Sequence, residues 1–196
     1  MENLVQEAWD YIKLDDLVNL SKLVPDQVPV NSSISNDKCE IRILLHAAAA
    51  FGAINCFKYL KDKGADLDAT TPSGFTALHW AAYGGWEEIM DVICSTNFDI
   101  NSADSKNAQT PLHVAAARGH LNAAQYLVSH GALLDAVAGF KWTPLHFAVA
   151  YGHEDVAKFL VKKGAKYGDN QVDSLRRSPD ILAKEYKRNW WSDIIS

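Results

Sequence analysis

No stretch of this sequence is apolar over a length that could cross a bilayer. The longest apolar run, Ile43 to Ile54, is rich in alanine and contains His46, whereas a membrane-spanning helix needs about 20 predominantly apolar residues. A secretion signal is missing as well, because Glu2, Glu7 and Asp10 interrupt the N-terminal segment where a basic and then an apolar stretch would be needed. We therefore expect no membrane segment and a cytoplasmic or nuclear location.

Cysteine is scarce and shows no pattern of disulfides or metal ligands. The three cysteines, Cys39, Cys56 and Cys94, are odd in number and have no Cys-x-x-Cys spacing, which argues against a disulfide scaffold and against zinc. Apolar residues flank Cys56 and Cys94, so we expect both to be buried, reduced thiols. Cys39 follows a polar segment and is the one thiol that the sequence leaves as a candidate for exposure and reactivity.

Positive charge is not in excess either. The chain has 19 Lys and Arg residues against 24 Asp and Glu residues, a formal net charge of −5, with both signs spread along the sequence. This distribution creates no positive field for phosphate groups, so nucleic acid is a poor candidate partner. With 48% hydrophobic residues, the chain of 196 residues is long enough to bury a core and to fold throughout.

Signatures of enzymes and of metal sites are absent too. The sequence has no glycine-rich phosphate loop, no His-Glu-x-x-His, no Cys and His spacing for zinc and no Gly-x-Ser-x-Gly turn. We therefore expect no catalytic activity, no cofactor and no bound metal ion.

The sequence does contain an internal repeat. A segment related to Thr-Pro-Leu-His occurs four times, with its histidines 33, 34 and 33 residues apart. The four copies begin at Ile43, Thr76, Thr110 and Thr143. A second marker follows each histidine by eighteen residues, and its four copies begin at Gly64, Asn97, Gly131 and Gly164. Two markers with one period indicate a repeat protein rather than a chance match.

At these residues the chain resembles the ankyrin repeat, a unit of about 33 residues with a turn and two helices. The resemblance is strong from Asp37 to Ala165 and weaker at both ends. Threonine can cap the first helix of each unit, and proline suits the next position, where its missing N–H has no helical partner to lose. The resemblance implies an all-α fold, an ankyrin-repeat solenoid of stacked helix-turn-helix units with short β-hairpin fingers.

The period divides the chain into six segments of one predicted domain, residues 1–196. Both ends look like degenerate repeats that serve as caps, because terminal repeats need a polar outer face. The predicted segments are an N-terminal cap at 1–35, full repeats at 36–68, 69–101, 102–135 and 136–168, and a C-terminal cap at 169–196.

Glycine marks the turns of each unit. One glycine separates the two predicted helices, at Gly52, Gly85, Gly119 and Gly152. Another ends the second helix in a left-handed residue, at Gly64, Gly131 and Gly164, and we expect Asn97 to play the same part. The family also has glycine two residues before the threonine, but only Gly74 matches, so the geometry of the other fingers stays open. An extra residue around Ser105 to Ala108 predicts a longer third finger.

The regularly spaced histidines admit a structural and a functional interpretation. His46, His79, His113 and His146 fall in separate units, which argues against a shared metal or catalytic cluster. In the family that the chain resembles, the imidazole ties the start of a helix to the neighbouring turn. We expect this structural role here.

Several aromatic residues admit either a packing or a contact role. Trp80 and Phe147 lie four residues after the threonine position, where a large apolar side chain normally packs on the next repeat. Trp190 and Trp191 could cover the last core layer or anchor a second contact. We expect packing for these four. The sequence gives no role for Trp86, which stands where later repeats have histidine.

Ankyrin-type stacks present their finger tips and first helices on a concave side, and that side binds partners in most relatives. Here the positions that the fold leaves variable carry aromatic residues and arginines, which dominate binding energy at protein interfaces. The candidate protein-binding residues are Arg42, Phe51, Phe75, Tyr83, Gln109, Arg118, Trp142 and Tyr151. The alternative is that Phe75 and Trp142 only pack onto neighbouring fingers.

The resemblance implies a non-catalytic protein-protein interaction module, such as an adaptor, scaffold, inhibitor or assembly factor, that binds a protein partner and is a monomer when free. An alternative is a regulatory subunit or effector that acts only within a larger enzyme complex. A third hypothesis makes Asn101 a hydroxylation site, because asparagines at this position are hydroxylated in relatives. The repeat encodes the scaffold, whereas a few variable surface residues select the partner.

Overall fold

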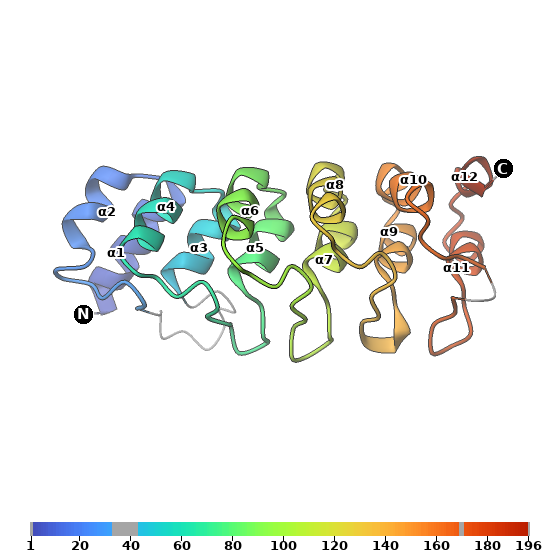
Figure 1. The fold of residues 1–196 in the computed structure, drawn as a ribbon, viewed down its shortest axis with the longest axis horizontal. Helices are drawn as coiled ribbons and strands as arrows, with labels where there is room; N and C mark the ends of the chain where they lie inside the picture. The colour runs from blue at the N-terminus through green and yellow to red at the C-terminus, as the bar shows by residue number, and fades with distance from the viewer. Residues whose placement is uncertain (1, 33–42, 169–170, 196) are drawn as a thin grey trace. The chain divides into compact units, whose positions relative to one another are not determined.

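The computed structural model describes residues 2–32, 43–168 and 171–195 as a succession of helix pairs (Figure 1). The structure divides into two compact units, Met1–Phe98 and Asp99–Ser196, which we call the N-terminal and the C-terminal unit. One helix pair lies in each of the six segments that the repeat period delimits. That all six segments form one domain stays a prediction.

In the N-terminal unit the helices form two rows (Figure 1). The pairs are α1 (Glu2–Lys13) with α2 (Leu17–Leu23), α3 (Leu44–Phe51) with α4 (Ile54–Asp62), and α5 (Ala77–Gly84) with α6 (Glu87–Cys94). The first helices of these pairs pack on one another, and so do the second helices. We call the first helix of each pair the inner helix and the second the outer helix.

The C-terminal unit repeats this arrangement (Figure 1). Its pairs are α7 (Pro111–Arg118) with α8 (Leu121–Ser129), α9 (Pro144–Tyr151) with α10 (Glu154–Lys162), and α11 (Pro179–Glu185) with α12 (Trp191–Ile195). A 3-10 turn, η1 (Gly139–Lys141), precedes α9. The part of the chain that the structure describes contains no β-strand, so the all-α repeat fold is confirmed.

Three inner helices begin at a reciprocal cap between threonine and histidine. The backbone N–H groups of Thr76, Thr110 and Thr143 donate to Nδ1 of the histidine three residues later, at 3.2, 3.0 and 3.2 Å. Helix α3 lacks this cap because Ile43 takes the place of threonine. Nδ1 of His46 accordingly has no hydrogen-bond partner among the described residues.

The second ring nitrogen of these histidines reaches the next finger. Nε2 of His46 lies 2.9 Å from the Ala69 carbonyl, Nε2 of His113 lies 3.0 Å from that of Ala136, and Nε2 of His146 lies 3.3 Å from that of Arg177. Where Nδ1 accepts from a backbone N–H, the proton sits on Nε2, which then donates to the carbonyl. The predicted structural role, which ties a helix start to the neighbouring turn, is confirmed for His113 and His146.

The outer helices end in two different ways. Left-handed glycines follow α4, α8 and α10, with φ of 87° at Gly64, 95° at Gly131 and 96° at Gly164. The prediction that Asn97 is left-handed is wrong, because Asn97 has no positive φ. Helix α6 has eight residues, one fewer than the other three. Its last carbonyls are instead bound by the hydroxyls of Ser95 and Thr96, at 2.8 and 2.6 Å.

The core consists of the leucines and alanines of the inner helices together with the apolar stripe of the outer helices. Trp80 and Phe147, each 9% exposed, belong to it as predicted, and Trp191 is 4% exposed in the last helix pair. Trp190 is half-buried.

Cys56 is buried, but Cys94 is only half-buried, which corrects the prediction for Cys94. Cys39 lies outside the described residues.

The fingers that connect the helix pairs are turns rather than strand ladders. A backbone hydrogen bond joins the two ends of each described finger, and a second lies inside the turn. The end-to-end bonds run from the N–H of Thr71 to Phe75, of Asp104 to Gln109, of Ala138 to Trp142 and of Asp173 to Arg177. The second of these fingers is one residue longer than the others, as the 34-residue spacing predicted. The fingers therefore keep the turn of a β-hairpin without its strands.

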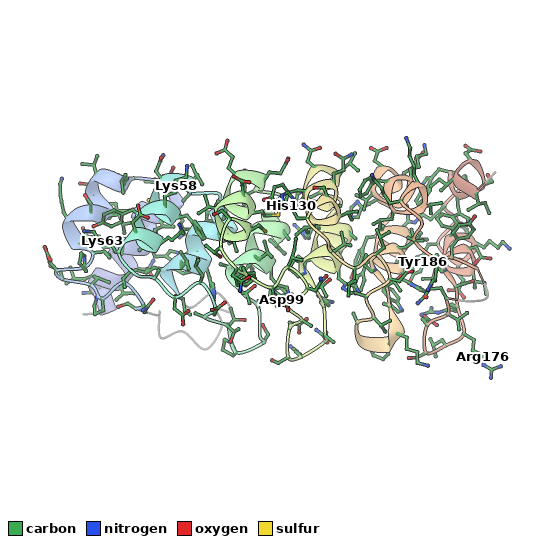
Figure 2. The ribbon with its side chains drawn as sticks, viewed as in Figure 1. Lys58, Lys63, Asp99, His130, Arg176 and Tyr186 are labelled. Atoms are coloured by element: carbon green, nitrogen blue, oxygen red, sulfur yellow. The ribbon has the colours of Figure 1, made fainter. Side chains whose placement is uncertain are left out.

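Each of these fingers keeps a left-handed residue two positions before the helix cap, even where glycine is missing. The φ angle is 90° at Gly74, 54° at Ala108, 61° at Lys141 and 59° at Arg176, and Figure 2 shows the Arg176 side chain projecting from its finger. This conformation costs about 1–2 kcal/mol for a residue with a Cβ atom. Three of the four fingers therefore hold a strained residue.

Replacing Ala108 by glycine should relieve this strain. The strain released exceeds the extra backbone entropy that glycine gives the unfolded chain, so we expect Ala108→Gly to raise the free energy of unfolding by about 0.5–1 kcal/mol. Urea denaturation measures the change. Ser105→Gly is the control, because Ser105 lies in the same finger without a positive φ, and it should be neutral or destabilising. A loss of stability with Ala108→Gly would contradict a strained finger.

Stability should also depend on the protonation of His46. Burial lowers the pKa of His46 to about 4 from its usual 6.5, against the opposing effect of the hydrogen bond to Ala69. Burial also lowers the pKa of His146. Between the folded and unfolded pKa values of His46 only the unfolded chain binds the proton. The contribution of neutral His46 to the free energy of unfolding is therefore fully present above pH 6.5 and is lost as the pH drops toward 4.

Urea denaturation at a series of pH values checks this dependence. We expect His46 to account for a loss of about 2 kcal/mol between pH 6.5 and 5. His46→Gln keeps a side-chain N–H donor but cannot titrate in this range, so its stability should fall less steeply with acid. Equal slopes for the two proteins would show that His46 is not kept neutral by the fold.

Candidate protein-binding surface

Four of the predicted binding residues lie at the C-terminal ends of inner helices. Phe51, Tyr83, Arg118 and Tyr151 occupy the last or next-to-last position of α3, α5, α7 and α9. All four are exposed, and the aromatic rings of Phe51, Tyr83 and Tyr151 are 40%, 39% and 60% accessible. Phe51 and Tyr83 belong to the N-terminal unit, and Arg118 and Tyr151 belong to the C-terminal unit. Each unit thus presents two such side chains.

Buried rings hold the exposed rings in place. Phe51 meets the edge of Trp9 at a centroid distance of 5.9 Å, Tyr83 meets Trp80 at 5.7 Å, and Tyr151 stacks on Phe147 at 6.3 Å. The three supporting rings are each less than a tenth exposed. A side chain that is already ordered loses less rotamer entropy when a partner binds.

The predicted finger residues are less accessible. Phe75 is half-buried and stacks on His79 at 4.9 Å. Trp142 is half-buried, and its Nε1 donates to the Asp173 carboxylate at 3.1 Å. Gln109 is half-buried, with its backbone N–H bound to Asp104 at 2.7 Å. Their part in binding stays a prediction, and Arg42 lies outside the described residues.

A side chain from the following repeat secures the C-terminal end of three inner helices. Nε1 of Trp86 donates to the Ala50 carbonyl at 3.1 Å, and Nε2 of His153 lies 3.0 Å from the Ala117 carbonyl. Arg188 donates to the carbonyls of Val149 and Ala150, at 3.0 and 2.5 Å. Trp86, whose role could not be predicted from the sequence, therefore contacts the end of the preceding inner helix as His153 does in a later repeat.

These contacts require glycine at the turn between inner and outer helix. A Cβ atom on Gly52 would lie 2.6 Å from the Trp86 ring, and one on Gly119 would lie 2.3 Å from Nδ1 of His153. Both glycines are also left-handed, with φ of 75°. The backbone that carries Phe51 and Arg118 is thus held by a donor that only glycine leaves room for.

Exposed apolar residues on the fingers of the C-terminal unit were missed from the sequence. Phe140 is 80% exposed in a left-handed conformation with φ of 58°, and Leu175 is 70% exposed in the next finger. The Ser174 N–H donates to the Phe140 carbonyl at 2.8 Å and links the two fingers. A large apolar residue inside a short turn, as in Ala138-Gly139-Phe140-Lys141, is the sequence signal that could have identified this surface.

A family profile described as "Ankyrin repeats (3 copies)" matches residues 19–104 and 98–171, well over half of the sequence. The chain belongs to the ankyrin-repeat family. Ankyrin repeats are protein-protein interaction modules, and the exposed residues described above lie on this scaffold.

Curated relatives share parts of this ankyrin chain. It is 35% identical over 79 residues to protein phosphatase 1 regulatory subunit 27 of Mus musculus, covering 40% of this chain and 51% of that protein. It is 32% identical over 108 residues to a putative palmitoyltransferase of Danio rerio, covering 55% of this chain and 16% of that protein. It is 31% identical over 96 residues to the B-cell lymphoma 3 protein homolog of Mus musculus, covering 47% of this chain and 21% of that protein. The chain thus spans about half of the first relative and much less of the others.

Asn101 connects two ankyrin repeats. Its Oδ1 accepts from the Leu133 N–H at 2.9 Å, and its Nδ2 donates to the Gly131 carbonyl at 3.3 Å. Asn31 and Asp135 make the matching contact with the N–H groups of Asp66 and Lys166, at 3.1 and 2.9 Å. A structural reason for Asn101 therefore exists, and its hydroxylation stays a hypothesis.

Cys56 is a buried thiol of the described ankyrin repeats. Burial, reinforced by a hydrogen bond to Asp15, raises the pKa of the Cys56 thiol to about 12. Residues 2–32, 43–168 and 171–195 hold no group of three or more His, Cys, Asp or Glu that could hold a metal ion. The same residues include no helix long and apolar enough to span a bilayer.

Alanine at Gly119 should be more damaging than alanine at Gly131. Both glycines have positive φ, but nothing lies within 4 Å of a Cβ atom on Gly131, whereas the His153 ring obstructs one on Gly119. We expect Gly131→Ala to lower the free energy of unfolding by about 1 kcal/mol through backbone strain alone. Gly119→Ala should lower it by on the order of 3 kcal/mol, because the ring must also move and leave the Ala117 carbonyl without its donor. Equal losses in urea denaturation would contradict the close approach of His153.

Proposed function

We propose that this chain is a non-catalytic protein-binding module, acting as an adaptor, scaffold, inhibitor or assembly factor. Its partner binds to the exposed residues that each of the two units presents at the C-terminal ends of its inner helices. The observation that supports this most directly is the recurrence of an exposed aromatic residue or arginine in the last turn of these helices. Phe51, Arg118 and Tyr151 are the last residues of α3, α7 and α9, and Tyr83 is one residue before the end of α5.

Three physical properties support this surface. Tyr and Arg dominate binding energy at protein interfaces, and central residues contribute about 2 kcal/mol or more. The rings are ordered in advance by Trp9, Trp80 and Phe147, which limits the entropy lost on binding. The backbone beneath them is fixed by helix ends rather than by free loops, as an interface of defined shape requires.

A regulatory subunit or effector that acts only within a larger enzyme complex is the second candidate. The match to a relative named as a regulatory subunit of protein phosphatase 1 supports it. The two candidates differ in what the recovered partner does. If the partner is an enzyme whose turnover changes when the purified chain is added, the regulatory role is favoured over a scaffold.

Other properties follow from the same proposal. We propose that the free chain is a monomer, that it works in the cytoplasm or nucleus, and that it does not bind nucleic acid, in keeping with its net charge of −5. Hydroxylation of Asn101 would add the mass of one oxygen atom to its peptide from native cells.

The binding surface can be tested by replacing Tyr83, Arg118 and Tyr151 together with alanine. We expect affinity for the partner recovered by co-purification to fall by on the order of 3 kcal/mol or more. Exposed truncations change stability by only about half a kcal/mol each, so the denaturation midpoint should move little. Calorimetric titration and urea denaturation of the same samples separate the two effects.

A matched triple variant on the outer helices is the control. Lys58, Asp91 and Gln125 are exposed on α4, α6 and α8, and Figure 2 shows Lys58 at the outer edge of α4. Their joint replacement by alanine should leave affinity intact. If this variant lost binding while the inner-helix variant kept it, the partner would dock on the outer helices.

A further inference from the structure

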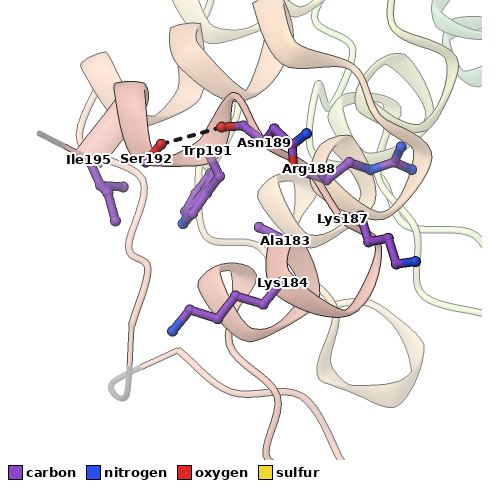
Figure 3. Close-up of a pocket in the computed structure, with 8 residues that line it drawn as sticks. All are labelled: Ala183, Lys184, Lys187, Arg188, Asn189, Trp191, Ser192 and Ile195. Carbon is purple, nitrogen blue, oxygen red and sulfur yellow. Dashed lines mark hydrogen bonds between the residues drawn. The ribbon is translucent and has the colours of Figure 1, made fainter.

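The last helix pair carries an open surface pocket that the inner-helix surface does not include. It has a volume of about 510 Å³ and lies where α11, the turn after it and α12 meet (Figure 3). Its lining residues are Ala183, Lys184, Lys187, Arg188, Asn189, Trp191, Ser192 and Ile195. Cavities of this size accommodate small ligands or a few side chains of a partner.

The pocket combines an apolar floor with a basic rim. Trp191 and Ala183 are buried and Ile195 is 42% exposed, so apolar surface remains accessible inside the pocket. Lys184 and Lys187 are both exposed, and neither has an ion-pair partner among the described residues. Arg188 adds a third positive charge while its guanidinium holds the carbonyls of Val149 and Ala150.

One polar group in the wall of the pocket has no partner. Nε1 of Trp191 is buried and lacks a hydrogen-bond acceptor among the described residues. Figure 3 shows this edge of the indole directed toward the space between Lys184 and Ile195. A buried donor left unsatisfied costs about 1–3 kcal/mol, which a ligand oxygen would offset once the indole turned its N–H into the pocket.

We propose that this pocket binds a short acidic peptide segment of a protein partner. An apolar side chain of the peptide packs on Ile195, beside the buried Trp191, and neighbouring carboxylates lie against Lys184 and Lys187. Charge supports this occupant, because the rim is basic although the whole chain carries a net charge of −5. An anionic membrane fits less well, because helices that lie on membranes insert exposed aromatic rings and Trp191 is only 4% exposed.

Selection from a random short-peptide library displayed on phage, with the full chain as the target, tests the proposal. We expect recovered peptides in which Asp or Glu flanks a large apolar residue, with affinity that falls as salt is raised. The double variant Lys184→Glu/Lys187→Glu should bind a labelled synthetic copy of such a peptide with an affinity lower by on the order of tenfold or more. Ile195→Asp should also weaken it, because it places a negative charge on the floor.

The control is Lys58→Glu/Lys63→Glu, which changes the net charge equally on exposed lysines of the N-terminal unit (Figure 2). It should leave peptide affinity unchanged, and thermal denaturation should show all three variants folded. The proposal is overturned if the selected acidic peptides bind Lys184→Glu/Lys187→Glu and Ile195→Asp as tightly as they bind the unchanged chain. It is also overturned if the control variant weakens peptide binding equally. Binding to phosphatidylserine vesicles that depends on Lys184 and Lys187, without peptide binding, would overturn it in favour of a membrane.

Discussion

A neutral imidazole, buried where one repeat meets the next finger, is the contact on which the rest of this structure depends. At His113 and His146 one ring nitrogen accepts from the backbone of the threonine that starts the helix, and the other meets a carbonyl of the following finger. One side chain thus sets the first turn of its own helix and the position of the next finger. The ring can do both only while it carries a single proton, and at His146 burial lowers the pKa and so favours this neutral form.

The location of the proposed binding residues follows from this start point. An inner helix that begins at the threonine cap runs for eight residues and ends at a left-handed glycine, so the residue beside the glycine is placed by the cap two turns earlier. Trp86, His153 and Arg188 then hold the final carbonyls from the next repeat. In α7 and α9 the variable side chains of Arg118 and Tyr151 therefore sit on a backbone that is fixed at both ends, which allows the surface to change without the scaffold.

Features that depend on the spacing of nearby residues could be predicted from the sequence alone. The helix starts at Thr76, Thr110 and Thr143 and the longer finger at Asp104 follow from motifs within a few residues of one another. Features set by contacts between distant residues were not predictable. The left-handed Ala108 and Lys141 are held by the fingers around them, and the bond between Trp86 and Ala50 joins residues 36 positions apart. The prediction for Asn97 was wrong where α6 is one residue shorter than α4, α8 and α10, and the Ser95 and Thr96 hydroxyls bind carbonyls of its last turn.

The donor that closes each inner helix is an indole at Trp86, an imidazole at His153 and a guanidinium at Arg188. What these groups share is a long side chain with an N–H donor, so three different residue types make the same kind of hydrogen bond at this position. A profile built on residue identity loses track of such a position, and the family match ends at residue 171. The Arg188 contact carries the same device beyond that point, so repeat architecture extends further along this chain than its sequence motifs do.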